Sequence, residues 1–157
     1  MQMTRELGAD GRITSEGRMS LGPMSLGPMS LGPIEYADAP PQVRAVYDDI
    51  KRTHGVPDVN NFWKYLAHDP AGLKRTWDSL KEIMAPGALD PLVKEMVYLA
   101  VSVTNGCGYC IASHTAGARK AGMSEAMFGE LMAVVGMANE TNRLVNGYRV
   151  PIDEGFK

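Results

Sequence analysis

The sequence has few of the residues that build metal sites and permanent cross-links. Its 157 residues include only two cysteines and three histidines. Cys107 and Cys110 are separated by two residues, and a bridge closing so short a loop would remove little entropy from the unfolded chain. A zinc site would need one or two more ligands, but His54 and His68 lie in separate segments without matching spacing and are expected to be turn or cap residues. Reversible redox chemistry is the favoured interpretation of the cysteines, ahead of a zinc site, a structural disulfide or an inert buried pair.

The chain also lacks basic runs and long apolar runs. Its 16 Lys and Arg and 18 Asp and Glu are interspersed, with a net charge of −2, so we expect no nucleic-acid partner. The longest strongly apolar run, Met96–Val103, is far shorter than the roughly 18 residues of a membrane span, and no signal-peptide stretch is present. We therefore expect no membrane partner and a cytoplasmic location, where a CxxC pair is more often catalytic or metal-binding than structural.

Two segments differ in composition. Residues 1–33 are polar and Gly-rich and contain the pentapeptide MSLGP three times, from Met19 to Pro33. A proline every five residues leaves no room for a stable helix, so this segment is interpreted as a tail, an artefact, or an arm that packs on a neighbouring subunit. Residues 34–157 are expected to form one domain.

The domain is predicted to be all-α, with about six helices and no alternating strand. Proline and Asp-Pro start signals, glycine stops and apolar residues at 3–4 spacing predict helices over residues 40–52, 61–67, 70–84, 91–104, 107–121, 124–136 and 138–148. The helix over 91–104 carries apolar residues around most of its surface, so we expect it to be buried nearly all round.

The stretch GCGYCIASH, residues 106–114, places both cysteines at the start of a helix that follows a glycine stop. Unpaired N–H groups and the positive end of the helix dipole favour a thiolate there, and the spacing lets the sulfurs reach bonding distance. His114 lies four residues after Cys110, on the same helix face, where it can take a proton from the thiol. This register favours Cys110 as the cysteine that attacks and Cys107 as the resolving partner. By analogy with thioredoxin-like pairs, the alternative is Cys107.

Glu95 is the remaining candidate. If residues 91–104 and 107–121 fold as an antiparallel hairpin, Glu95 lies about 15 Å from the turn and His114 about 10 Å. Glu95 should therefore reach His114 before either sulfur, which predicts a proton relay from Glu95 through His114 to Cys110. The alternative interpretation is a glutamate that only complements the helix N-terminus.

The pattern E-x11-C-x2-C-x3-H, formed by Glu95, Cys107, Cys110 and His114, resembles the AhpD-like alkylhydroperoxidase group of the carboxymuconolactone decarboxylase superfamily. The surrounding VTNGCGYC and IASHTAGARKAGMS, and Asn142-Arg143, agree over roughly residues 40–148. The resemblance implies an AhpD-like helical bundle that assembles into homodimers, trimers or hexamers. It implies peroxide reduction through a sulfenic acid and a disulfide, with electrons from a lipoyl or thioredoxin-like dithiol donor and no metal or organic cofactor.

One position departs from the family pattern. Tyr109 stands directly before the second cysteine, where the best-studied type of member has a relay histidine. A phenol is a poorer base than an imidazole at neutral pH, so either His114 carries the relay alone or Tyr109 only donates a hydrogen bond. Three functions follow: a thiol peroxidase, a dithiol–disulfide oxidoreductase or electron adaptor with weak peroxidase activity, and a non-enzymatic assembly protein on the same fold.

Overall fold

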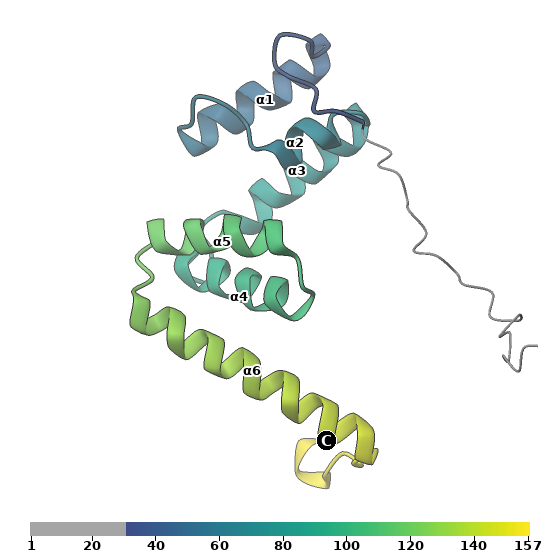
Figure 1. Ribbon diagram of the computed structural model, residues 1–157, viewed down its shortest axis with the longest axis vertical. Helices are drawn as coiled ribbons and strands as arrows, with labels where there is room; N and C mark the ends of the chain where they lie inside the picture. The colour runs from purple at the N-terminus through teal and green to yellow at the C-terminus, as the bar shows by residue number, and fades with distance from the viewer. Residues whose placement is uncertain (1–30) are drawn as a thin grey trace, which may run out of the picture.

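The computed structural model describes residues 31–157 and is built from helices, with no strand in that range (Figure 1). The all-α prediction is therefore confirmed for the described part of the chain. Six α-helices and a short 3-10 helix follow one another in the order α1 Pro41–His54, α2 Asn61–Leu66, α3 Pro70–Met84, α4 Pro91–Thr104, α5 Gly108–Lys120, α6 Glu125–Tyr148 and η1 Glu154–Phe156.

Local signals in the sequence account for where most helices begin. The side chains of Asp69, Asp90 and Ser124 cap α3, α4 and α6 by accepting hydrogen bonds from backbone N–H groups of the first turn. A proline occupies the first helical position of α3 and α4, where its missing N–H costs nothing. The Asp90 cap sets the start of α4, one of the two helices that carry the candidate site.

The helices pack around two apolar clusters. In the first, α1 and α3 bury their apolar faces against each other and against α2, around Tyr47, Leu73 and Trp77. In the second, Leu99 of α4 and Ala118 of α5 are fully buried, and α6 adds half-buried side chains. Figure 1 shows the α4–α5 hairpin between the α1–α3 group and α6, so the hairpin belongs to the middle of the molecule.

The last two predicted helices are one helix. The prediction of a break between residues 136 and 138 is wrong, because α6 runs without interruption from Glu125 to Tyr148 (Figure 1). A single glycine inside a helix costs only about 1 kcal/mol, and packing of the first half of α6 on α4 offsets this cost. The helix ends at Arg149, which adopts a left-handed conformation with φ 52°.

The expected burial of the helix over 91–104 is also wrong for this chain. Only Leu99 and Ser102 of α4 are buried, whereas Val93, Val97 and Val101 are 41%, 53% and 53% exposed. These three valines are spaced four residues apart and form one stripe, because α5 and α6 cover only the other sides of α4. We call this set the α4 valine stripe.

Two expectations concern other parts of the chain. The MSLGP repeats lie outside the described residues except for the last three positions, so the arm, the tail and the boundary at residue 34 stay predictions. No helix within residues 31–157 has the length and apolar character needed to cross a membrane.

Candidate functional site

The turn between α4 and α5 places the cysteine pair. Gly106 adopts φ 69°, which closes the end of α4: its N–H bonds to the carbonyl of Val103, and the N–H of Cys107 bonds to the carbonyl of Ser102. This double hydrogen bond is the Schellman arrangement, and its left-handed residue favours glycine. Cys107 then becomes the N-cap of α5 directly after the turn.

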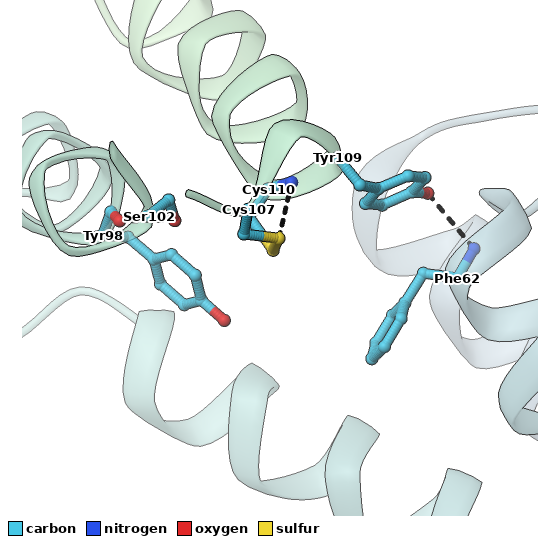
Figure 2. Close-up of a disulfide and its surroundings, with 6 residues drawn as sticks. All are labelled: Phe62, Tyr98, Ser102, Cys107, Tyr109 and Cys110. Carbon is cyan, nitrogen blue, oxygen red and sulfur yellow. Dashed lines mark hydrogen bonds between the residues drawn. A yellow bond between two sulfur atoms is a disulfide. The ribbon is translucent and has the colours of Figure 1, made fainter. Parts of the chain in front are cut away.

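The two cysteines form a disulfide in the structure, with their Cα atoms 5.3 Å apart. The Sγ atom of Cys107 accepts a hydrogen bond from the backbone N–H of Cys110 at 3.3 Å (Figure 2). The same N–H, together with the helix dipole, would stabilise a thiolate on Cys107 after reduction. The pair therefore lies where the sequence predicted it, at the first turn of a helix.

Glu95 and His114 are in direct contact. Nδ1 of His114 lies 2.7 Å from Oε2 of Glu95, and the two side chains are 16% and 22% exposed. With the carboxylate at Nδ1, the imidazole hydrogen is held on that nitrogen, which leaves Nε2 free to accept a proton. Glu95 thus reaches His114 across the antiparallel hairpin, as the rise per residue of the two helices predicted.

Two further residues hold this pair and were missed from the sequence. The ring of Tyr98 stacks on that of His114, with centroids 3.6 Å apart and planes 19° apart. A Cβ atom at Gly117 would lie 2.8 Å from Cδ and Oε2 of Glu95, so the carboxylate fits only because residue 117 has no side chain. Both lie three residues from a predicted site residue, on the same helix face, which is the signal that could have found them.

Tyr109 contacts α2. Its hydroxyl oxygen accepts a hydrogen bond from the backbone N–H of Phe62 at 3.2 Å, and the two rings lie 6.4 Å apart (Figure 2). Phe62 is the second residue of α2, so this N–H has no partner inside the helix. Tyr109 therefore links the start of α5 to the start of α2.

A cavity of about 740 Å³ lies beside these residues. One wall is a face of α5 that includes Cys110, His114 and Gly117, and Glu95 and Tyr98 of α4 adjoin it. The opposite wall is largely aromatic and aliphatic and comes from α1, α2 and α3, including Trp63 and Trp77. Cys110 lines this cavity, whereas Cys107 is not among its lining residues.

The sequence predicted no metal site. Within residues 31–157, no three side chains of His, Cys, Asp or Glu gather in a way that could hold a metal ion. His68 contacts the carbonyl oxygen of Gly32 at 2.7 Å, away from the cysteines. His54 is the last residue of α1 and lines the cavity across from α5.

Comparison with known proteins agrees with this fold. The family model described as "Carboxymuconolactone decarboxylase family" matches residues 70–153, more than half of the chain and all of the site on α4 and α5. The chain belongs to the carboxymuconolactone decarboxylase family. Within it, the chain is an AhpD-like member, as its relatives show.

Two relatives carry this assignment. The crystal structure of the alkylhydroperoxidase AhpD core from Rhodospirillum rubrum is 48% identical, with a TM-score of 0.77, and the match covers 82% of this chain and 98% of that one. The alkyl hydroperoxide reductase AhpD of Azorhizobium caulinodans is 31% identical over 98 residues, 59% of this chain and 53% of the relative. The matched part therefore spans about half the length of that curated relative.

Proposed function

We propose that this protein is a thiol-dependent peroxidase that reduces alkyl hydroperoxides through a dithiol–disulfide cycle of Cys107 and Cys110. One observation carries the proposal: the Glu95–His114 pair, 2.7 Å apart, lines the same cavity as Cys110. A cysteine pair needs only helix position to cycle, but a thiol that attacks peroxide also needs a base for its own proton and an acid for the leaving oxygen. Relatives named for alkyl hydroperoxide reduction support the same activity.

In the first half of the proposed cycle, His114 acts as a base and then as an acid. His114 takes the thiol proton of Cys110, and the thiolate attacks the terminal oxygen of the hydroperoxide. The O–O bond breaks, Cys110 becomes a sulfenic acid, and the leaving alkoxide takes the proton from His114 and departs as an alcohol. Glu95 stabilises the imidazolium that forms between these two transfers.

The second half of the cycle forms the disulfide seen in the structure. Cys107, deprotonated at the helix N-terminus, attacks the sulfur of the Cys110 sulfenic acid, and hydroxide leaves and is protonated to water. A dithiol donor, such as a lipoyl or thioredoxin-like protein, then returns two electrons by thiol–disulfide exchange. Cys110 lines the cavity, so its sulfur is the one that we expect the donor to attack.

A peroxide-consumption assay with dithiothreitol or dihydrolipoamide as reductant tests the proposal. Glu95→Gln should lower kcat/KM by about 10²-fold, within the range that general acid–base groups contribute. Glu130→Gln is the matched control, because Glu130 is an exposed glutamate of α6 away from the cavity. Activity that survives in a Cys107→Ser/Cys110→Ser double variant would contradict both redox functions.

A second function is favoured by Tyr109. Its hydroxyl accepts a hydrogen bond from the backbone of Phe62, and Tyr109 stands where the best-studied type of member has a relay histidine, which leaves His114 as the histidine of α5 that can serve the cysteines. A weaker peroxidase with the same dithiol would act as a dithiol–disulfide oxidoreductase or electron adaptor. Insulin reduction that exceeds peroxide turnover in a side-by-side assay would favour this alternative.

We further propose that the chain forms a homo-oligomer, a dimer, trimer or hexamer. The α4 valine stripe and the exposed Val134, Met137 and Leu144 of α6 support an interface, because apolar stripes of this kind cost free energy when left in water. An assembly protein without enzymatic activity would use the same surface. Native mass spectrometry tests the assembly, and a monomer at micromolar concentration would contradict it.

A further inference from the structure

The cavity extends well beyond the reacting sulfur. Its lining residues on α5 are spaced along one helix face from Cys110 to Lys120. These two residues are ten positions apart, which corresponds to about 15 Å along the helix axis. The cavity is therefore long enough for a ligand much larger than a small peroxide, with Cys110 at one end and Lys120 at the other.

The lining holds two lysines and one carboxylate among its ionisable groups. Glu95, the only carboxylate in the lining, is bound to His114, and Lys81 is bound to Asp49 at 2.6 Å. Lys120 differs from both, because the ion pairs formed within residues 31–157 leave it without a carboxylate partner. An anion that enters the cavity would thus meet an ammonium group that has no ion-pair partner, with the Glu95 carboxylate, already bound to His114, one helical turn away against Gly117.

His54 lies at the same end. Its ring is 5.4 Å from that of Trp77, and packing there removes water from part of the imidazole, which lowers the pKa of His54. The nearby charge of Lys120 lowers that pKa further, against a smaller opposing effect of Glu95. In its neutral form His54 offers one N–H donor to a ligand in the cavity.

Between the two ends, the walls of the cavity are mostly apolar. The aromatic rings of Phe62, Trp63 and Trp77 lie on the side opposite α5, with Leu80 and Met84 beside them. Burial of methylene groups against such a surface is favourable, because it removes apolar area from water. The middle of the cavity thus matches an aliphatic chain.

We propose that the cavity binds an aliphatic hydroperoxide with a carboxylate head group, which Lys120 pairs with and His54 hydrogen-bonds. The chain lies along the aromatic wall, and the peroxide group reaches Cys110. The placement of the peroxide group at Cys110 rests on the proposed function. The subsite for the carboxylate head group concerns binding alone. It assigns Lys120 and His54 a role in specificity.

Binding of unreactive probes to the oxidised full-length protein tests the subsite. The two tryptophans of the chain both line the cavity, so their fluorescence reports occupancy directly. Decanoate should bind more tightly than decanol, which has the same chain and no charge. Lys120→Gln should weaken decanoate binding about fivefold, as expected for a partly exposed ion pair, without changing decanol binding.

Two variants complete the test. Lys120→Arg keeps the charge and should retain most of the preference for decanoate, which separates loss of charge from loss of fold. Lys74→Gln is the matched control, because Lys74 is an exposed lysine on α3 that pairs with Asp78 outside the cavity. Equal affinities for decanoate and decanol, or a Lys120→Gln protein that binds decanoate as tightly as wild type, would overturn the inference.

A kinetic measurement keeps this inference apart from the proposed function. The ratio of kcat/KM for a carboxylate-bearing aliphatic hydroperoxide to that for tert-butyl hydroperoxide should fall about fivefold in Lys120→Gln. A wild-type protein that prefers decanoate but consumes no hydroperoxide would refute the peroxidase and support the anionic subsite. A protein that consumes both hydroperoxides, with a kcat/KM ratio that Lys120→Gln leaves unchanged, would support the peroxidase and refute the anionic subsite.

Discussion

Substitution of Gly117 by alanine perturbs the candidate relay without replacing any of its members. A new Cβ would lie 2.8 Å from Cδ and Oε2 of Glu95 and 3.0 Å from Oε1. Ordinary contacts of carbon with heavy atoms begin near 3.5 Å, so the carboxylate has to move by about 0.7 Å. A shift of that size away from His114 would stretch the 2.7 Å contact between Oε2 and Nδ1 beyond the usual hydrogen-bond range.

The expected result is a fall in kcat/KM of about 10²-fold, because misplacement of a catalytic group by about 1 Å has a cost of that order. Stability should change little. An alanine inside a helix gains roughly 0.5–1 kcal/mol over glycine, and the displacement of a flexible carboxylate offsets part of that gain. Peroxide consumption and urea unfolding, measured on the same preparations, separate the two effects.

Gly129→Ala is the matched control for this substitution. Gly129 also lies inside a helix, but no heavy atom is within 4 Å of the Cβ position. This variant should be more stable by about 0.5–1 kcal/mol and fully active. If Gly117→Ala were as active as Gly129→Ala, the contact between Glu95 and His114 would not matter for turnover.

A double-mutant cycle tests whether the effect of Gly117→Ala depends on Glu95. In a Glu95→Ala background the carboxylate that Cβ would strike is gone, so Gly117→Ala should cause no further loss of activity. Two losses that simply multiply would show that residue 117 acts through something other than Glu95, and would refute this account of the glycine.

Three other predictions concern the two cysteines, the carboxylate of Asp49 and the cap of α3. With peroxide and a sulfenic-acid probe, Cys107→Ser should be labelled at Cys110, whereas labelling only at Cys107 in Cys110→Ser would reverse the assigned roles. Hydrogen bonds from Lys81 and then from a buried indole lower the pKa of Asp49, so the stability that this carboxylate adds is present above its unfolded pKa of about 4 and is lost as pH falls through the lower folded value. Asp49→Asn should accordingly flatten part of the acid limb in a plot of urea midpoint against pH, and an unchanged limb would contradict the assignment. Asp69→Ala removes the N-cap of α3 and should lower the free energy of unfolding by about 1 kcal/mol, whereas an unchanged urea midpoint would mean that solvent replaces the cap.

Local features of the sequence predicted much of the candidate site. The hairpin needed only a glycine stop and two helices of known rise, and from these Glu95 could be placed against His114 although 18 residues separate them. Gly117 and Tyr98 were missed because three-residue spacing places them on the helix face of a site residue but does not show which side chain they meet across the hairpin. The break expected near residue 137 failed for a related reason, since contacts of α6 with α4 outweigh the low helix propensity of one glycine.

The sequence by itself determined most of the helices, the caps at Asp69, Asp90 and Ser124, and the position of the cysteines at a helix start, because these depend on neighbours within a few residues along the chain. Only the tertiary structure decided what surrounds the cysteines. The packing of α1–α3 opposite α5 creates the cavity, brings His54 to the same end as Lys120, and sets Tyr109 against Phe62. It also leaves the α4 valine stripe exposed, because an apolar helix surface carries no information on whether its own chain or another covers it.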